Sequence, residues 1–495
     1  MGQLKKIALK LHQVSGSVLS LMFFIWFLSG MVLIYAGFPH ASREDRFLHL
    51  KPFKQSDFEN IKSLPDTITC SFDLEKQGNK PVYRVFTGKK AQQVYDAQSL
   101  ACIRSFPEES CLQIAESFTG TRVIKTVKLN ELDQWMPWNY YQPLLPIFKF
   151  YMNDPLHTVI YISSKTGSIV QQTDRKGRWA ARVGAIPHWI YFRSLRLKAQ
   201  LWNQVVIWLA GIGVFVSLSG LIAGMIRLRK QSQWGKTGSI TPYKKFWYKW
   251  HHLAGFFFGL FVFTFVLSGL FSVIDLPLCL TPVNKDFSPQ KEWEKSQGSP
   301  AGSGHSLKEL WQALEKKEGM RKLSWETSMG NSAWYVYSDD YQNPDVYMVT
   351  SDSVFKHKEY SLEQISGRAE QLFKGSIYSV TTQTDYDNYY QKSGMSNHPL
   401  PVYRIEWKND DQNLIYIDPV TGKVVDTFNK NSKIHRWLYQ GLHKFDFQFL
   451  KEHEWLRKTL LIFLSFGGLA VSFTGMALGW KRIRRSLKFK NKIIS

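Results

Sequence analysis

The chain has 495 residues, of which 44% are hydrophobic, and it carries a formal net charge of +23. This length exceeds that of one ordinary domain, and a mean hydropathy of −0.24 requires much polar, water-facing material. A nucleic-acid-binding protein needs a basic soluble domain, whereas here lysine and arginine cluster beside long apolar stretches. We therefore expect no nucleic-acid partner.

Four uncharged stretches are long enough to cross a bilayer, which requires about 20 apolar residues. They lie at residues 14–38, 202–226, 251–274 and 459–480. The first is longer than the apolar part of a signal peptide, roughly 7–15 residues, so we predict a permanent anchor. The chain is expected to be an α-helical, multi-pass membrane protein in contact with the lipid bilayer.

The charges beside these stretches predict the orientation. Lysine and arginine occur without acidic residues in three places: the start of the first region (1–38), the loop 227–250 and the tail 481–495. Such segments stay in the cytoplasm, so both termini are expected there. The large segments 39–201 and 275–458 are then extracytoplasmic.

The two outer segments predict α+β domains. Stretches rich in β-branched and aromatic residues predict strands at 82–86, 158–162, 333–337 and 402–407. The sequence YIDPVTGKVV at 416–425 predicts two strands joined by a tight turn that contains Pro419 and Gly422. Helices are expected at 306–317 and 361–372, because each opens with the capping-box pattern of a serine followed by Glu or Gln.

All four cysteines lie in the predicted outer segments, where disulfides are permitted: Cys70, Cys102, Cys111 and Cys279. Cys102 and Cys111 are close enough in sequence to bridge, but spacing alone does not decide the pairing. The chain has no CxxCH sequence, so covalent attachment of a c-type haem has no support.

Two halves of the chain match each other. The first span and its approach, residues 10–30, align without a gap to residues 249–269 around the third span. A second gap-free alignment begins with Pro146 opposite Pro401 and continues through the following span. We predict a two-fold internal repeat, in which each half consists of a span, an outer domain, a histidine-bearing segment and a second span.

Four of the 13 histidines form a repeat-matched set: His12, His251, His188 and His443. The first two lie at the cytoplasmic ends of spans one and three, and the other two lie just outside spans two and four. Imidazole is a standard axial ligand of haem iron, and one pair at each face suits electron transfer across a bilayer. The sequence therefore predicts two b-type haems.

Neighbouring residues leave alternatives open. His252 beside His251, and His435 near His443, are rival ligands. Gly16 and Gly255 lie on the same helix face as His12 and His251, where the lack of a side chain would let a flat macrocycle approach the backbone. The alternative for both glycines is close helix packing.

This order of elements resembles the PepSY-associated transmembrane family over nearly the whole chain. The resemblance is carried by KxHxxxG at the start of spans one and three, the hairpin at 416–425 and HRWLYQGLH at 435–443. It implies four transmembrane helices and two PepSY-like domains, in a bacterial inner membrane with both domains periplasmic. The first half departs from the pattern, because Ala180 stands opposite His435.

Together these features predict a di-haem b oxidoreductase that passes electrons to an extracytoplasmic acceptor. The resemblance implies a ferric siderophore or other iron chelate, and hence a role in iron acquisition. No GxGxxG or P-loop sequence occurs on the cytoplasmic side, so a separate cytoplasmic reductase or membrane quinol would supply the electrons. Catalytic residues are not identified, and no Ser-His-Asp or HExxH arrangement suggests hydrolysis.

The alternative function is a non-catalytic, membrane-anchored PepSY protein that binds peptides or regulates an extracytoplasmic peptidase. Aromatic residues at matching places in the outer segments could line a groove for a bulky ligand or form the domain cores. They are Trp135, Trp138, Tyr140 and Tyr141 in the first segment, and Tyr386, Tyr389 and Tyr390 in the second.

Overall fold

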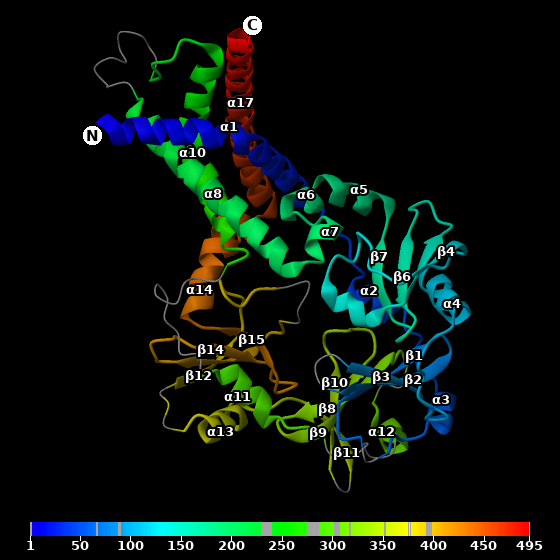
Figure 1. Cartoon of the computed structure of the whole chain (residues 1–495). Coiled ribbons are helices and arrows are strands. Elements are labelled where there is room, and N and C mark those ends of the chain that lie inside the picture. The colour runs from blue at the N-terminus through cyan, green and yellow to red at the C-terminus, as the bar shows by residue number, and fades with distance from the viewer. Residues whose placement is uncertain are drawn as a thin grey trace.

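Figure 1 shows the computed structural model of the chain. It describes residues 2–494 apart from 66–67, 88–90, 229–239, 275–286, 301–306, 316–317, 351–352, 375, 377 and 393–397. Cys279, Ser306 and much of the predicted cytoplasmic loop lie outside the described residues.

Four long helices form a bundle: α1 (Gly2–Leu33), α8 (Ala199–Ile226), α10 (Phe246–Leu270) and α17 (Glu454–Ile494). Each contains a segment long and apolar enough to span a membrane, which confirms the four predicted stretches. Helix α1 packs along α17 and α8, and α10 packs against the same two helices. Large apolar side chains such as Val18, Trp208 and Phe257 remain exposed on the outside of the bundle, as expected for surfaces that meet lipid.

One antiparallel sheet joins the two outer segments. Its order is β11-β10-β9-β8-β1-β2-β3, and strand β1 (Phe72–Gln77) pairs with β8 (Lys322–Ser328), so that Leu74 lies opposite Leu323. The remaining strands are β2 (Lys80–Thr87), β3 (Ala91–Asp96), β9 (Asn331–Tyr337), β10 (Asp345–Val349) and β11 (Val354–His357). This shared sheet differs from the prediction of separate domains at 39–201 and 275–458, because pairing between strands so far apart in the chain leaves no local sequence pattern.

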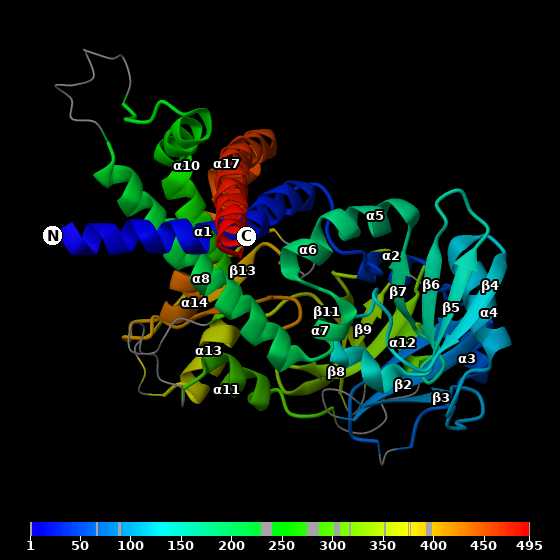
Figure 2. The same ribbon diagram turned by 45° about the horizontal axis from the view of Figure 1, so that its top comes forward.

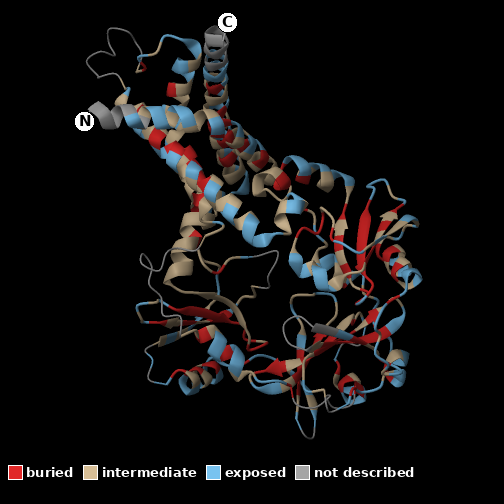
Figure 3. Cartoon of the chain, viewed as in Figure 1, coloured by how far each residue is buried: buried red, intermediate tan, exposed pale blue. Residues whose placement is uncertain are grey.

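Three short helices, α2 (Arg43–Leu48), α3 (Gln55–Asn60) and α12 (Leu307–Ala313), lie beside this sheet. The buried core there combines aliphatic side chains such as Leu74 and Leu323 with the aromatic rings of Phe72, Trp325 and Trp334. Figure 3 shows buried residues concentrated along the strands, whereas the bundle helices carry exposed outer faces.

Each outer segment also forms a four-stranded antiparallel meander. The first consists of β4 (Val123–Leu129), β5 (Ile147–Met152), β6 (Val159–Ser163) and β7 (Ile169–Thr173). The second consists of β12 (Tyr378–Gln383), β13 (Val402–Trp407), β14 (Leu414–Ile417) and β15 (Val424–Phe428). The helices α4 (Glu108–Thr119) and α13 (Leu362–Leu372) precede them. The matching strand order agrees with the expected duplication, which itself stays a prediction.

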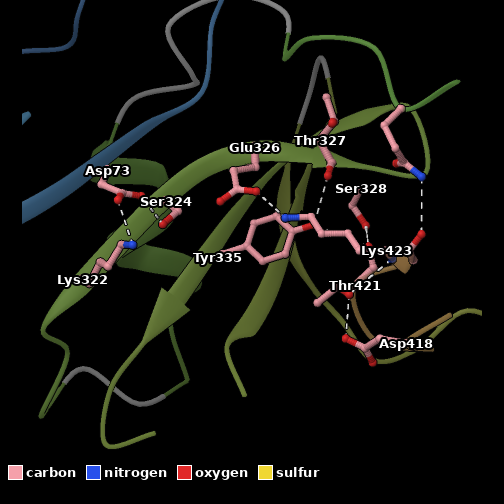
Figure 4. Close-up of polar contacts among 12 residues, drawn as sticks. Asp73, Lys322, Ser324, Glu326, Thr327, Ser328, Tyr335, Asp418, Thr421 and Lys423 are labelled. Carbon is pink, nitrogen blue, oxygen red and sulfur yellow. Dashed lines mark hydrogen bonds and ion pairs between the residues drawn. The ribbon is translucent and has the colours of Figure 1, made fainter. Parts of the chain in front are cut away.

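The turn of each final hairpin docks onto the seven-stranded sheet. Gly167 and Gly422 adopt φ of +64°, a left-handed conformation that glycine accepts without strain. Arg84 Nη1 donates to the carbonyl of Thr166 at 2.7 Å, and Ser328 Oγ donates to that of Thr421 at 3.0 Å. Figure 4 shows the second junction, where Thr421 also bonds to Asp418 and Lys423 pairs with Glu326.

Short helices connect each meander to the bundle. After β7 come α5 (Arg175–Val183), α6 (Ala185–Trp189) and α7 (Arg193–Arg196), and Figure 2 shows α5 and α6 between the bundle and the first meander. After β15 come α14 (Lys430–Arg436), a π-helical turn (Trp437–Gly441), α15 (Leu442–Lys444) and α16 (Gln448–Glu452). Helix α6 packs on α1, and α15 packs on α10.

Several local predictions can be compared with these elements. The four predicted strands correspond to β2, β6, β9 and β13, and the helix expected at 361–372 is α13, with a capping box between Ser361 and Gln364. The helix expected at 306–317 is shorter, because α12 ends at Ala313. Cys102 and Cys111 form no disulfide: the first is exposed and the second is buried.

The matched aromatic residues belong mostly to the domain interior. Trp135 and Tyr390 are buried within apolar clusters of the first and second segments, as the core interpretation predicts. Tyr140 is exposed.

Candidate cofactor site

His12 on α1 and His251 on α10 form one imidazole pair, which we call the inner pair after the orientation predicted from the sequence. Their ring centroids are 6.2 Å apart and their planes differ by 27°. His12 Nδ1 lies 3.2 Å from the carbonyl oxygen of Val216 on α8, and His251 Nδ1 lies 3.2 Å from that of Val471 on α17. Each ring is therefore held by a neighbouring spanning helix.

The outer imidazole pair consists of His188 on α6 and His443 on α15. Their ring centroids are also 6.2 Å apart, and their planes differ by 57°. His188 Nδ1 lies 3.1 Å from the carbonyl oxygen of Trp26 on α1, and His443 Nδ1 lies 3.1 Å from that of Phe265 on α10. Both rings thus reach back from outside the spans to the outer parts of spanning helices.

The short helices that carry the outer pair end in the same way. Two residues after His188, Ile190 has φ of 54°, and two residues after His443, Phe445 has φ of 52°. This left-handed backbone conformation is unfavourable for residues other than glycine, so the surrounding packing must impose it. It ends each helix one residue after its histidine and turns the chain there.

All four rings dock on one kind of helix surface. The residue whose carbonyl contacts the ring is followed three positions later by a serine or threonine, and four positions later by a glycine. The four sequences are VSLSG (216–220), VSFTG (471–475), WFLSG (26–30) and FVLSG (265–269). In a helix these positions share one face, so carbonyl, hydroxyl and glycine meet a single imidazole. We call each such surface an imidazole cradle.

The cradle hydroxyls lie near the same ring nitrogen as the carbonyls. The distances from Nδ1 to the hydroxyl oxygen are 3.5 Å for Ser219, 3.0 Å for Thr474, 3.2 Å for Ser29 and 3.1 Å for Ser268. Since a carbonyl can only accept, Nδ1 carries the proton in each ring. The other nitrogen, Nε2, is then the one that can bind a metal ion.

The cradle glycines leave space for the rings. A Cβ atom added to Gly220 would lie 2.7 Å from Cε1 of His12, and one added to Gly30 would lie 3.3 Å from Cε1 of His188. The corresponding distances are 3.4 Å at Gly269 and 3.5 Å at Gly475. These Ser-Gly and Thr-Gly pairs fall opposite each other when the two halves of the chain are aligned, but their contact with the histidines is visible only in the structure.

The spacing of both pairs fits a metal ion bound between two imidazoles. With a metal–nitrogen bond of about 2.0 Å, and about 1.1 Å from that nitrogen to the ring centre, rings on opposite sides of one ion have centroids about 6.2 Å apart. The observed separation is 6.2 Å in each pair. Within the described parts of the chain, no group of three or more His, Cys, Asp or Glu side chains could hold a metal ion. A haem would satisfy such a two-ligand site, because its macrocycle supplies the remaining ligands.

The rival histidines make different contacts. His252 Nε2 lies 3.2 Å from the carbonyl of Gly224, and His435 Nε2 lies 2.6 Å from that of Phe271. In these two rings the proton is therefore on Nε2, the nitrogen that is left free in the four paired histidines. The structure brings neither rival into an imidazole pair.

The glycines named with the inner pair differ from each other. A Cβ atom added to Gly16 would lie 3.9 Å from His12 Cε1, an ordinary contact distance. One added to Gly255 would meet nothing within 4 Å, so space is open beside His251. The open space at Gly255 does not reflect close helix packing there.

The outer pair is held in its neutral state. Burial lowers the pKa of His188 to about 4 and that of His443 to about 3, and both residues lie outside the spanning segments. Both rings are therefore uncharged at pH 7, which is the form that can donate a lone pair to a metal ion.

A series of packed phenylalanine rings extends from the outer pair into the helix bundle. The Phe265 ring stacks on His443 with a centroid distance of 4.9 Å, and the Phe261 ring lies 4.1 Å from Phe265. Phe27 of α1 is 6.3 Å from both rings and packs against Gly468 of α17. This side of the pair is thus closed by aromatic packing.

Comparison with known proteins adds one domain assignment. The family model for PepSY, described as peptidase propeptide and YPEB domain, matches residues 359–428, which include α13 and the second meander. No curated protein matches the chain. The chain thus contains a PepSY domain together with four helices long and apolar enough to span a membrane, as in a PepSY-containing membrane protein.

Proposed function

We propose that this protein is a di-haem b membrane oxidoreductase that passes electrons across the bilayer to an acceptor on the outer side, a ferric siderophore or other iron chelate. The observation that carries the proposal is the repeated geometry of two imidazole pairs, each with centroids 6.2 Å apart and with each Nδ1 facing a helix carbonyl. Packing alone does not require two pairs to share one separation and one pattern of contacts.

The chain's own residues would hold and orient the cofactors. His12 and His251 would ligate one haem, and His188 and His443 the other. The cradle carbonyls and hydroxyls fix the ring tautomer and make Nε2 more electron-rich, as the outer hydrogen bonds of metal-bound histidines generally do. When bound, haem supplies a one-electron iron couple whose potential depends on these ligands and on burial.

The electron acceptor is inferred from the chemistry of iron reduction and from the resemblance to the PepSY-associated transmembrane family. One electron delivered outside converts one Fe(III) to Fe(II), while a quinol or a cytoplasmic reductase loses that electron. The lower charge weakens the hold of hard oxygen ligands on the iron. The outer pair is carried by segments from both halves of the outer region, so an acceptor bound there would lie on the correct side for this step.

The test is a reduced-minus-oxidised optical spectrum of the purified protein together with its haem-to-protein ratio. We expect two haems per chain, and one in each of the variants His12→Ala and His443→Ala. His252→Ala and His435→Ala are matched controls, since both residues are histidines beside the pairs, and both variants should keep two. Colourless wild-type protein, or full haem content in His12→Ala and His443→Ala, would contradict the proposal.

The matched family favours a second candidate, because its description includes peptidase propeptides. In that case the outer region would bind peptides or restrain a peptidase, and the paired histidines would only pack the helices. Haem-free protein that inhibits a protease through residues 359–428 would select this function.

A further inference from the structure

A cavity of about 530 Å³ lies where the first meander docks onto the seven-stranded sheet. Its walls come from α2, α4, strands β1, β2, β8 and β9, and the turn at Gly167. Small-molecule sites have volumes of roughly 300–1,000 Å³ and combine aromatic walls with a few polar groups. The rings of Phe47, Phe118, Tyr337 and Tyr341 provide such walls here.

The lining carries more positive than negative charge. Its carboxylates, Asp73 and Glu75, are already paired, the first with Lys322 at 2.8 Å and the second with Arg84. Lys76, also in the lining, pairs with Asp57 at 2.8 Å. The remaining cations are Arg43, Arg46 and Lys51.

None of these three cations forms a salt bridge in the described part of the chain, although Glu75, which is paired with Arg84, is close enough to Arg46 to favour its charged form. Arg43 and Lys51 are exposed, and Arg46 is partly buried. Arg46 donates to the carbonyls of Ile169 at 3.2 Å and Ser42 at 3.3 Å, and Lys51 donates to Asn79 at 2.9 Å. Burial lowers the pKa of Arg46, which shows the cost of holding its charge there. Glu44 and Asp45 on the same helix are exposed and do not line the cavity.

The corresponding junction of the second meander is filled. Trp293 Nε1 donates to the carbonyl of Gly422 at 3.0 Å, and a Cβ atom added to Gly422 would lie 2.6 Å from Cγ of Met329. Glu326 pairs with Lys423 there (Figure 4). Docking a hairpin turn on the sheet therefore needs neither an open cavity nor three cations without salt bridges.

We propose that this cavity binds a small organic anion with two or more carboxylate or phosphate groups, held by Arg43, Arg46 and Lys51 against the aromatic walls. A guanidinium group can bind either oxyanion with two parallel hydrogen bonds, so both chemistries suit the site. The site does not depend on haem or on electron transfer, because none of its residues touches an imidazole pair.

The test is isothermal titration of the full-length protein in detergent with citrate and, separately, with pyrophosphate. We expect saturable binding of at least one probe, and the stronger of the two identifies the oxyanion. Arg46→Gln and Arg43→Gln should each weaken it about tenfold or more. Arg104→Gln, which removes an exposed arginine outside the lining, should leave it unchanged.

Ser117→Trp provides a second test that keeps every charge, because Ser117 lies on the lining and a large ring there fills the space. We expect this variant to lose binding even if an arginine variant fails to fold. The proposal is overturned if neither probe binds at about 1 mM. It is also overturned if the Arg43, Arg46 and Ser117 variants that fold bind as tightly as wild type, or if Arg104→Gln weakens binding equally.

Discussion

The inner and outer imidazole pairs have the same centroid separation but different supports. The inner rings belong to the spanning helices α1 and α10, whereas the outer rings belong to the short helices α6 and α15. Their planes differ by 27° inside and by 57° outside. All four rings nevertheless rest on the same kind of cradle. The two pairs therefore share a separation and a kind of cradle, but they differ in ring rotation and in the helices that carry the histidines.

The largest expected effect on haem content comes from replacing a cradle glycine with alanine. This effect should differ between the two pairs. In Gly220→Ala the new Cβ would lie 2.7 Å from His12 Cε1, so the ring must move. In Gly269→Ala the distance to His443 Cε1 is 3.4 Å, which requires at most a small adjustment. We expect Gly220→Ala to lose the inner haem and Gly269→Ala to keep both, as measured by haem-to-protein ratio. Equal retention in both variants would show that the cradles do not control ligation.

The pairs should also differ in their dependence on the outer region. His188 and His443 come from different outer segments, which the β1–β8 pairing joins, whereas His12 and His251 lie within the bundle. Leu323→Ala removes a fully buried side chain from this sheet and should destabilise it by about 2–5 kcal/mol.

We expect the outer haem of Leu323→Ala to be released at a lower temperature than the inner one, followed by absorbance during heating. Leu362→Ala is the control, because Leu362 is exposed on α13 of the PepSY domain. Simultaneous release of both haems in Leu323→Ala would argue against separate supports.

Removing one cradle hydroxyl should have a smaller effect, since the carbonyl still accepts from Nδ1. Loss of an outer hydrogen bond of this kind typically lowers metal affinity 10–100-fold, and we expect about 10-fold for Ser268→Ala and for Thr474→Ala. Haem transfer to an apo-acceptor protein measures the change. Ser272→Ala serves as control, because its hydroxyl bonds only to the carbonyl of Gly269 among the described contacts.

The smallest difference concerns the ring planes and needs no mutation. Because the interplanar angles are 27° and 57°, the two ferric centres should give two distinct low-spin signals in electron paramagnetic resonance. His443→Ala should remove one signal and leave the other unchanged. A single signal accounting for both centres would show that the pairs are equivalent when loaded.

The sequence revealed the parts of the site that depend on local pattern. Long apolar runs predicted the four helices, and the matched positions of His12, His251, His188 and His443 predicted which rings would pair. The cradles were harder to recognise, because a Ser-Gly sequence in a span is also a common packing feature. A cradle can hold a histidine only if the two lie on neighbouring helices. Which helices are neighbours is determined by packing between segments far apart in the chain.

Two other features were beyond prediction for the same reason. The seven-stranded sheet depends on β1 and β8, whose pairing joins residues near 74 to residues near 323. The cationic cavity likewise arises where α2, the sheet and a hairpin turn meet, so its lining is scattered along the sequence. By contrast, the alignment of the two halves already set His435 apart from His443, because Ala180 stands opposite it, and the structure adds the contact of its Nε2 with the carbonyl of Phe271.

The division of the outer pair between two segments has a consequence for biogenesis. His188 is translated long before His443, and domains generally fold from the N-terminus as synthesis proceeds. Both histidines of the inner pair have been synthesised once α10 is complete, but the cradle of His251 lies on α17. The outer pair requires the second outer segment and its docking on the first. Neither pair is therefore complete before the C-terminal part of the chain, which carries His443 and the cradle of His251, has been synthesised.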